Sequence, residues 1–342
     1  MSRLTEHINW TIVVSVGLLL IIGLVNLYSA TSTWGESGTP RLLWQQILWF
    51  GVGIFFLLIL AFSDYRIFEK LCYPFYILSI LLVILSLVKG NVVYGHKSWI
   101  GIGGFGIQPS EFAKLATIIM LAKFFSANPN PDGYDFIALI KPAIIAIIPT
   151  GLVVAQHDLG SAIFFVLIFF SFAWFAKVKT KVIFVILIVG IVTSVMGYQY
   201  VLSDYQKARI TTFVNPDYDI KGSGYHIAQS RIAVGSGKIF GKGYLKGNIN
   251  KLRYLPEKHT DFIFPVLAEE WGFLGCFITL AIYFTFLTIT IEIAKTARDR
   301  FGSFIAVGVC AFFFWQLTIN LGGVLGLMPL TGVTLPFLSY GG

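Results

Sequence analysis

The 342-residue chain has little charge: Asp, Glu, Lys and Arg make up only 12% of it, whereas 56% is hydrophobic. A soluble domain of this length cannot bury that much apolar surface, so the composition excludes a soluble globular protein. The chain also lacks the alternation of apolar and polar residues that a membrane β-barrel needs, which excludes that class. It has instead repeated runs of roughly 20 apolar residues, each long enough to cross ~30 Å of hydrocarbon as a helix.

Cysteine is scarce as well, and its placement excludes a disulfide framework or a thiolate metal site. The three cysteines, Cys72, Cys276 and Cys310, fall in or beside apolar runs and show no metal or redox spacing. We therefore expect them to be packing residues.

A phosphate-binding loop is absent too. The segment GSGKIFGKG (235–243) has Ser236 where such a loop needs its first glycine, and Gly243 follows Lys242 where Ser or Thr is required. The segment is therefore not a nucleotide site. Its glycines are expected to allow tight turns or re-entrant backbone, for example at the membrane interface.

The apolar runs predict an all-α, polytopic helical membrane protein with nine spans. The predicted spans are residues 9–30, 43–62, 71–88, 110–126, 136–155, 160–176, 181–200, 265–294 and 303–328. The first run is too long for a secretory signal and is interpreted as a retained span. We predict one transmembrane domain over residues 1–342, with a large extracytoplasmic loop, 202–262, between spans seven and eight.

Charge in the short connections predicts the orientation. Lys and Arg gather at 63–70, 177–181 and 295–300, whereas the connections at 31–42 and 156–159 carry almost none. The positive-inside rule places the N-terminus and the basic connections in the cytoplasm. The loop 202–262 then lies outside, with ten Lys and Arg against five Asp and Glu. Because the net charge of +8 is divided between orientation and this loop, it favours an anionic ligand rather than nucleic acid.

Asp261 is the first candidate for chemistry, because it lies where this basic loop enters an apolar span. One interpretation needs no function: Thr260 caps the helix, and Asp261 in the first turn interacts favourably with the helix dipole. The other is that a carboxylate with apolar residues on one side acts as a general base. Glu269 and Glu270 follow ~12 Å further along the helix, and we expect at least one of them to form an ion pair.

Further polar residues flank the other spans. In QPSEFAK (108–114), Glu111 and Lys114 share a helix face. They form either a surface ion pair or a site in which Lys114 reaches an anionic group in a central cavity. Trp99 is an interfacial anchor or a substrate contact, and Asp158 caps the sixth span or binds substrate.

The outer loop and the chain's last residues add basic and hydroxyl candidates. Arg209 and Arg231 in the loop are either solvated charges or phosphate ligands. The terminal stretch 326–342, which includes Ser339, mixes Pro, Gly, Thr and Ser where a helix is expected. Such irregular backbone is tolerated at membrane depth where it is buried or lines a cavity.

The stretches QPSEFAK, QHDLGSA, GYHIAQSRIAVGSGKIFGKG, LPEKHTDFIFPVLAEE and GVTLPFLSYGG together resemble the SEDS family (shape, elongation, division and sporulation) of bacterial cell-wall polymerases. They occur in the family's order over essentially the whole chain, and the fourth is similar to the rod-shape branch. The resemblance implies a peptidoglycan glycosyltransferase of the bacterial cytoplasmic (inner) membrane that uses lipid II, an undecaprenyl-diphosphate-linked disaccharide pentapeptide. It also implies a class B penicillin-binding protein and other elongation-complex membrane proteins as partners.

The same resemblance assigns roles to particular residues. The family's essential acid matches Asp261, and its other sensitive polar positions match Glu111, Lys114 and Asp158. Transfer from an α-linked diphosphate sugar to form a β-1,4 bond inverts the anomeric centre, and one carboxylate base suffices because diphosphate leaves unprotonated. The predicted substrate-binding residues are Glu111, Lys114, Asp158, Arg209, Arg231, Trp99, His259 and Ser339.

The developing diphosphate charge needs cations, for which Lys114, Arg209 and Arg231 are candidates. No residue spacing indicates a dedicated metal site, so a divalent cation, Mg²⁺ or Mn²⁺, would arrive with the substrate.

The sequence departs from the family pattern in four places, one of which is His157, where relatives commonly have Pro. Ser98 precedes Trp99 where relatives often have Arg, and Pro265 stands where they have a small residue and is expected to kink its span. The family has ten spans, and this sequence stops where the tenth would begin. Two other functions stay open: a flippase for the lipid-linked precursor, and a non-catalytic scaffold for the penicillin-binding protein.

Overall fold

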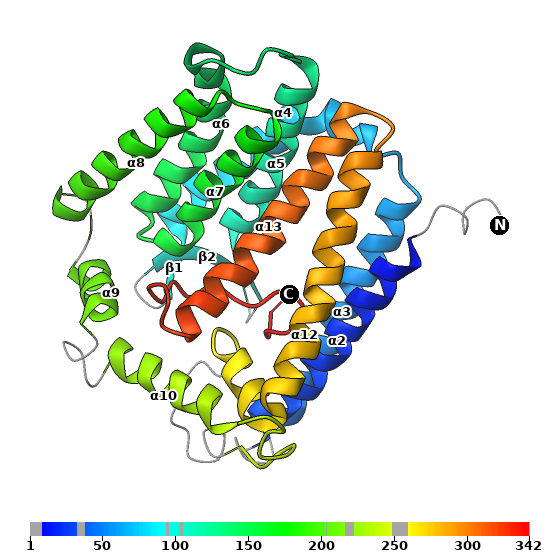
Figure 1. Cartoon of the computed structure of the whole chain (residues 1–342), viewed down its shortest axis with the longest axis vertical. Helices are drawn as coiled ribbons and strands as arrows, with labels where there is room; N and C mark the ends of the chain where they lie inside the picture. The colour runs from blue at the N-terminus through cyan, green and yellow to red at the C-terminus, as the bar shows by residue number, and fades with distance from the viewer. Residues whose placement is uncertain are drawn as a thin grey trace. The chain divides into compact units, whose positions relative to one another are not determined.

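Eleven helices dominate the part of the chain that the structure describes (Figure 1). This computed structural model describes residues 9–32, 38–93, 96–102, 105–200, 202, 204–215, 222–247 and 259–341. The helices, in chain order, are α2 (Trp10–Thr31), α3 (Gly38–Ala61), α4 (Arg66–Lys89), α5 (Pro109–Ala127), α6 (Phe136–Ala155), α7 (Leu159–Phe175), α8 (Thr180–Tyr200), α9 (Asp204–Val214), α10 (Ser223–Ser236), α12 (Ile263–Thr296) and α13 (Arg300–Val324).

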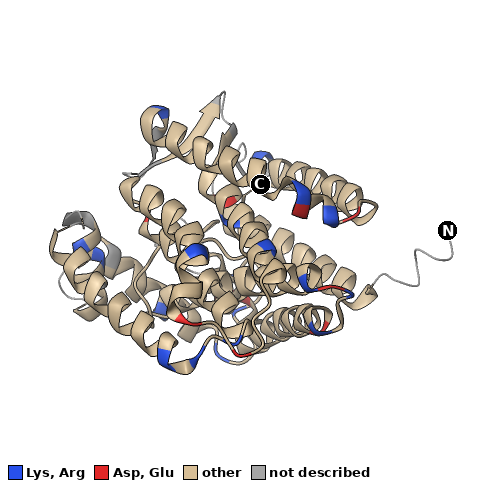
Figure 2. Cartoon of the chain, turned by 90° about the horizontal axis from the view of Figure 1, so that it is seen from above, with Lys and Arg blue, Asp and Glu red and all other residues tan. Residues whose placement is uncertain are grey.

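All nine predicted spans are helices, so the chain is a multi-pass helical membrane protein. Seven of them, α2, α3, α4, α6, α8, α12 and α13, are long and apolar enough to cross a bilayer. Of the other two, α5 carries three charged residues and α7 has 17 residues, so the count of nine crossings stays a prediction. Figure 2 shows the long helices free of charged residues over most of their length.

Two features of the loops were not predicted. The stretch before α5 forms a three-stranded antiparallel sheet of β1 (Asn91–Val93), β2 (His96–Ile102) and β3 (Phe105–Ile107). The loop 202–262 contains α9 and α10, which are too short and too polar to resemble spans. The loop's 216–221 and 248–258 stretches lie outside the described residues.

The helix α12 breaks at Gly272, whose backbone is non-helical (φ 66°, ψ −163°). Only glycine adopts this conformation readily. The predicted kink at Pro265 is wrong, because Pro265 lies in the first helical turn. There its missing N–H removes no intrahelical hydrogen bond.

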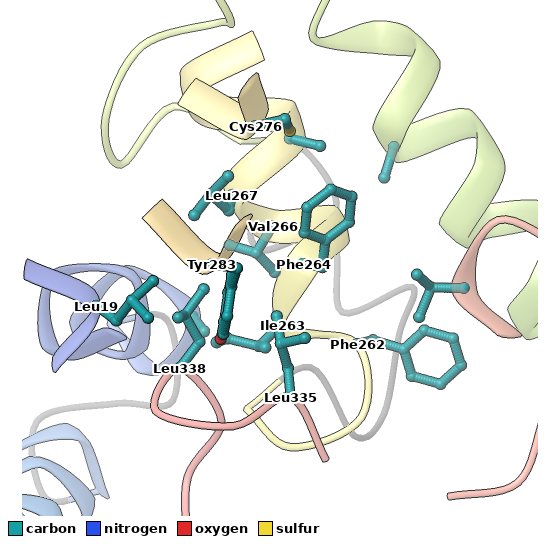
Figure 3. Packing of buried hydrophobic residues seen from close by; sticks show 14 residues of the cluster. Leu19, Phe262, Ile263, Phe264, Val266, Leu267, Cys276, Tyr283, Leu335 and Leu338 are labelled. Atoms are coloured by element: carbon teal, nitrogen blue, oxygen red, sulfur yellow. The ribbon is translucent and has the colours of Figure 1, made fainter. Parts of the chain in front are cut away.

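The chain forms two compact units. The first comprises Met1–Phe62, Ala208–Ile289 and Gln316–Gly342. Its core packs Leu19 of α2 against Tyr283 of α12 and against Leu335 and Leu338 beyond α13 (Figure 3). The Tyr283 hydroxyl donates to the carbonyl of Pro336, so the polar group of this buried ring is satisfied.

The second unit comprises Ser63–Lys207 and Thr290–Trp315. Its core stacks Phe125 of α5, Phe172 of α7 and Phe304 of α13, with ring centroids 5.6–6.1 Å apart. Such offset stacking holds three helices together where few polar contacts are available. The three cysteines are buried, as predicted for packing residues.

Candidate functional site

The residues beyond α13, 325–341, form an irregular stretch that we call the C-terminal segment. Ser339 fixes it to the turn before α12: its hydroxyl donates to the Thr260 carbonyl and accepts from the N–H of Leu335, both at 2.7 Å. The N–H of Tyr340 donates to the His259 carbonyl at 2.8 Å, and the two rings lie 5.9 Å apart. His259 and Ser339, both predicted to bind substrate, therefore lie where the C-terminal segment contacts the turn before α12 in the first unit.

Asp261 lies in the same turn, before α12 begins at Ile263. The first turn of α12 contains no acidic residue, so the predicted cap with Asp261 in that turn is wrong. Instead, the buried amide of Asn320 donates to the carbonyls of Asp261 and Val333, at 3.0 and 2.6 Å. A side chain from α13 thus fixes the backbone that carries the acid.

The Asp261 side chain is half-buried and faces a glycine. Its Oδ2 lies 3.5 Å from the position that a Cβ would take on Gly332, whose φ of 72° is in the left-handed region. A substitution at Gly332 would strain the backbone and bring a methyl group against the carboxylate. The C-terminal segment therefore sets the space around Asp261.

The two predicted loop cations contact the same segment. Nη1 of Arg209 in α9 donates to the Leu330 carbonyl at 3.2 Å. Cδ of Arg231 in α10 lies 3.3 Å from the position of a Cβ on Gly326. The first unit thus brings Arg209, Arg231 and the turn of Asp261 onto one irregular stretch of chain.

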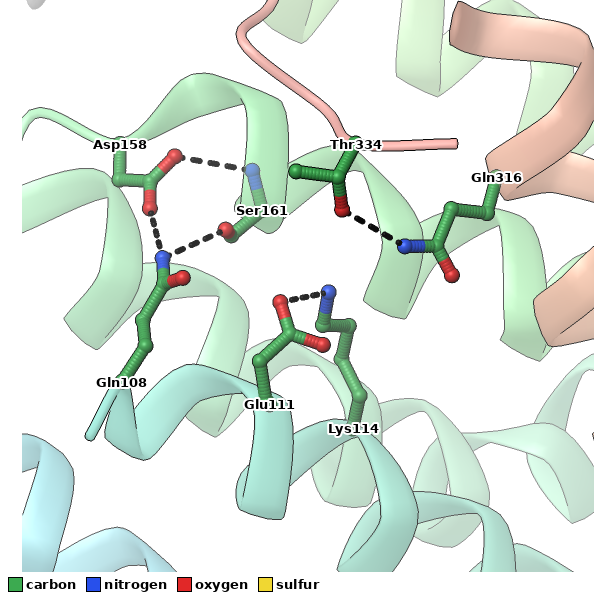
Figure 4. Close-up of polar contacts among 7 residues, drawn as sticks. All are labelled: Gln108, Glu111, Lys114, Asp158, Ser161, Gln316 and Thr334. Carbon is green, nitrogen blue, oxygen red and sulfur yellow. Dashed lines mark hydrogen bonds and ion pairs between the residues drawn. The ribbon is translucent and has the colours of Figure 1, made fainter. Parts of the chain in front are cut away.

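Three other predicted residues lie in the second unit. Lys114 and Glu111 of α5 form an ion pair of 2.6 Å, drawn in Figure 4. The Lys114 side chain is 3% exposed, so the alternative of a surface pair is wrong. Its ammonium lies 4.5 Å from the ring centre of Phe164 and 5.4 Å from that of Phe312. One carboxylate and two aromatic faces hold this buried cation.

Asp158 is the N-cap of α7, as one of its two interpretations predicted. Its Oδ1 accepts from the N–H of Ser161 and its Oδ2 from Nε2 of Gln108, both at 3.0 Å (Figure 4). Gln108 thereby joins the start of α5 to the start of α7. A role for Asp158 in binding substrate stays a prediction.

Trp99 lies in β2 and is 37% exposed. Its ring covers Gly106 of β3, where a Cβ would come within 2.9 Å of Cε3. The preceding Ser98 is buried. The structure thus places Trp99 on the central strand of the small sheet, and its contact with substrate stays a prediction.

The predicted ion pair of the paired glutamates is confirmed. Oε1 of Glu269 lies 2.6 Å from Nζ of Lys242, and Glu270 accepts from the hydroxyl of Ser29 at 2.5 Å. Both glutamates are buried just before the break at Gly272. The carboxylates of Glu269 and Glu270 therefore each bind a partner within the first unit.

Sequence reasoning missed the amides that place the turn. Asn320, and Asn26 of α2, whose Nδ2 donates to the Ile263 carbonyl at 2.9 Å, lie buried within apolar helices. A polar residue inside a span is expensive unless it is satisfied. An asparagine inside an apolar run was therefore the signal in the sequence that could have identified these two residues.

A resident metal does not fit the donors that the structure describes. Within the described ranges, no group of three or more His, Cys, Asp or Glu side chains gathers. Binding of a divalent cation together with the substrate stays a prediction.

Comparison with known proteins agrees with this architecture. The chain is 35% identical to the peptidoglycan glycosyltransferase MrdB of Escherichia coli K12, over 95% of this chain and 88% of MrdB. It is 31% identical to the peptidoglycan glycosyltransferase RodA of Treponema pallidum, over 99% of this chain and 94% of that protein.

A solved structure is similar over nearly the whole chain. It is a chain of a peptidoglycan synthase complex described as coordinating polymerization and crosslinking. The TM-score is 0.83 and the identity 29%, over 98% of this chain and 92% of the other. The model of the FtsW/RodA/SpoVE family, described as cell cycle proteins, matches residues 9–342. The chain therefore belongs to the FtsW/RodA/SpoVE family.

Proposed function

We propose that this chain is a peptidoglycan glycosyltransferase that polymerises lipid II into glycan strands during cell elongation. The names of its relatives support the activity. The observation that carries the proposal is the Asp261 turn, in which a half-buried carboxylate faces a glycine while buried amides hold the backbone. Such a fixed acid is what a base-catalysed transfer requires.

Asp261 is the general base. Its carboxylate takes the proton of the acceptor hydroxyl as that oxygen attacks the anomeric carbon of the donor sugar. The new carbon–oxygen bond forms on the face opposite the diphosphate, and the old bond breaks with its electron pair leaving on the diphosphate. One acid suffices, because diphosphate departs without being protonated.

Cations stabilise the diphosphate as it leaves. Arg209 and Arg231 contact the C-terminal segment next to the Asp261 turn, and Lys114 is a further candidate. A divalent cation, Mg²⁺ or Mn²⁺, bound by the substrate would supply additional positive charge. Trp99, His259, Ser339, Glu111 and Asp158 complete the proposed substrate-binding set.

The reaction takes place at the outer face of the bacterial cytoplasmic (inner) membrane, and the N-terminus is cytoplasmic. The basic connections support this orientation. A class B penicillin-binding protein, which crosslinks the new strand, is the proposed partner, together with other membrane proteins of the elongation complex. The similarity to a chain of a peptidoglycan synthase complex supports that partner.

The test compares purified wild-type protein with Asp261→Asn and Asp261→Glu on labelled lipid II, with the partner present. Because general base catalysis contributes about 10²–10⁴-fold, we expect Asp261→Asn to lose at least about 100-fold in polymerisation. Asp261→Glu should keep part of the rate, since it retains a carboxylate. Asp135→Asn, an exposed aspartate in an ion pair with Lys179, is the matched control and should be unaffected.

Three results would contradict the proposal. Normal polymerisation by Asp261→Asn would remove the general base from the mechanism. Movement of lipid II across vesicle membranes without any glycan product would favour a flippase instead. Crosslinking that depends on this chain while its own polymerisation is absent would indicate a scaffold.

A further inference from the structure

Residues 237–247, which we call the docked loop, bind the break in α12 through reciprocal backbone hydrogen bonds. The N–H groups of Lys242 and Gly243 donate to the carbonyls of Glu269 and Glu270, at 2.9 and 3.0 Å. These carbonyls end the first half of α12 and have lost their helical partners at the break.

The second half of α12 is satisfied by the same loop. The N–H groups of Phe273 and Leu274 donate to the carbonyls of Lys238 and Ile239, at 2.8 and 3.1 Å. An interrupted helix is stable at membrane depth only if its freed groups find partners. The docked loop therefore belongs to the same structural element as α12.

Glycines allow this close approach. A Cβ on Gly237 would overlap the Ala268 carbonyl, and one on Gly241 would overlap the Glu270 carbonyl. Gly241 and Gly272 also have φ values of 77° and 66°. The ion pair between Lys242 and Glu269 adds a charged contact to the backbone docking.

The docked loop lies where the hydrocarbon core should begin. The helix after the break runs without a charged residue from Phe273 to Ile291. At 1.5 Å per residue these 19 residues span ~28 Å, close to the ~30 Å of the hydrocarbon core. The break at Gly272 therefore falls at one boundary of the core.

The side chains of the docked loop match that boundary. Ile239 and Phe240 are 61% and 79% exposed, which is unfavourable in water for residues of this size. Tyr244 and Trp271 are partly exposed and their ring centres lie 6.2 Å apart, as in the aromatic belts of membrane proteins.

The basic residues of the docked loop also suit a position at the boundary of the hydrocarbon core. Lys238 and Lys246, on either side of the apolar pair, are exposed. Lysine side chains at this level reach lipid phosphates while their stems stay in the apolar layer.

We propose that the docked loop is a membrane anchor: Ile239 and Phe240 enter the acyl chains of the bilayer, and Lys238 and Lys246 bind phospholipid phosphates. The anchor fixes the first half of α12, and with it the Asp261 turn, at the level of the headgroups. Nothing in this inference depends on the proposed transferase activity.

Fluorescence quenching in lipid nanodiscs tests the anchor. Single cysteines replacing Phe240 and Lys246 carry an environment-sensitive dye, with the wild type as the background for its buried cysteines. Lipids with a nitroxide on the acyl chain should quench the dye at Phe240→Cys more than headgroup-labelled lipids do, and the order should reverse at Lys246→Cys. Aqueous iodide should quench neither efficiently.

Two variants calibrate the depths. Phe277→Cys, 59% exposed in the uncharged run of α12, should behave as a site in the acyl layer. Asp132→Cys, exposed in the connection between α5 and α6, should respond to iodide alone.

Efficient iodide quenching at Phe240→Cys would overturn the proposal, because the loop would then lie in water. Loss of acyl-chain quenching when the penicillin-binding protein is added would also overturn it, since the surface would then be a protein interface. Thermal unfolding of each labelled variant at the wild-type temperature shows that the substitution left the fold intact.

Discussion

Lys114 shows at the scale of single residues how this chain keeps a charge inside an apolar unit. Its side chain is 3% exposed, whereas that of its partner Glu111 is 43% exposed. The rings of Phe164 and Phe312 cover the ammonium where the carboxylate does not reach. Cation–π contacts strengthen when water is excluded, so the two rings help to hold the ammonium inside the unit.

This arrangement predicts different effects of single and double substitutions. Glu111→Gln removes the negative charge and leaves the buried cation with a neutral amide acceptor and the aromatic contacts. It should destabilise the protein, by less than the roughly 3–5 kcal/mol of a fully buried pair because Glu111 is partly exposed. Adding Lys114→Met removes the buried charge and should restore most of the lost stability. The unfolding temperature in detergent is the measurement.

Polymerisation of lipid II distinguishes a structural role of the Glu111–Lys114 pair from a role in substrate binding. If Lys114 binds diphosphate, the double variant should be stable yet inactive on lipid II. A double variant with wild-type polymerisation would restrict the pair to packing.

Sequence reasoning succeeds at this scale where the partner is local. Asp158 was open to interpretation as a cap, and it caps the helix that begins at the next residue. It fails where the partner is distant: the Asn320 amide reaches the Asp261 carbonyl, 59 positions away. A hydrogen bond to a backbone carbonyl leaves no residue pattern that could predict such a pairing.

At the scale of elements, the break in α12 and the docked loop explain each other. The sequence predicted one continuous span over 265–294, because the apolar run continues past Gly272. Isolated glycines in helices are common, and the pattern did not distinguish this one. The glycines of 235–243 did predict tight turns, which the positive φ values of Gly241 and Gly243 confirm, and the partner of that backbone is the helix break at Gly272.

Gly241→Ala should weaken the docked loop. A non-glycine residue in the left-handed region costs about 1–2 kcal/mol, and the methyl group would also overlap the Glu270 carbonyl. We therefore expect a lower unfolding temperature in detergent.

Gly151→Ala in α6 is the matched control, because nothing lies within 4 Å of the added Cβ. Alanine is favoured over glycine in a helix by about 0.5–1 kcal/mol, so this variant should be neutral or slightly stabilised. Equal unfolding temperatures for both variants would mean that the loop does not need glycine.

At the scale of the whole molecule, contacts within the second unit join connections predicted to share one side of the membrane. On the side predicted to be cytoplasmic, the Tyr65 hydroxyl donates to Asp299 at 2.6 Å. This bond and the Gly302 N–H hold the pKa of the Asp299 carboxyl below its usual value. Lys179 pairs with Asp135 at 2.7 Å across two further connections of that side.

Connections predicted to lie on the outer side are also joined by hydrogen bonds within the second unit. Gln108 before α5 donates to Asp158 before α7 at 3.0 Å, and Gln206 of α9 donates to the His157 carbonyl at 2.9 Å. The orientation was predicted from basic residues alone, which say nothing about contacts. Agreement between two independent signals supports the alternation of the predicted spans in this unit.

The orientation itself is tested by labelling with a membrane-impermeant maleimide. Asn215→Cys lies just after α9 and is exposed, and Asp132→Cys lies in the connection between α5 and α6 and is exposed. With the N-terminus in the cytoplasm, Asn215→Cys should be labelled in intact spheroplasts. Asp132→Cys should be labelled only after permeabilisation, because in this orientation it lies on the cytoplasmic side, which the maleimide does not reach.

The wild type supplies the background, since its cysteines are buried. The reverse pattern would place the large loop, and the Asp261 turn that ends it, in the cytoplasm, where a lipid II polymerase of the cell wall has no acceptor strand.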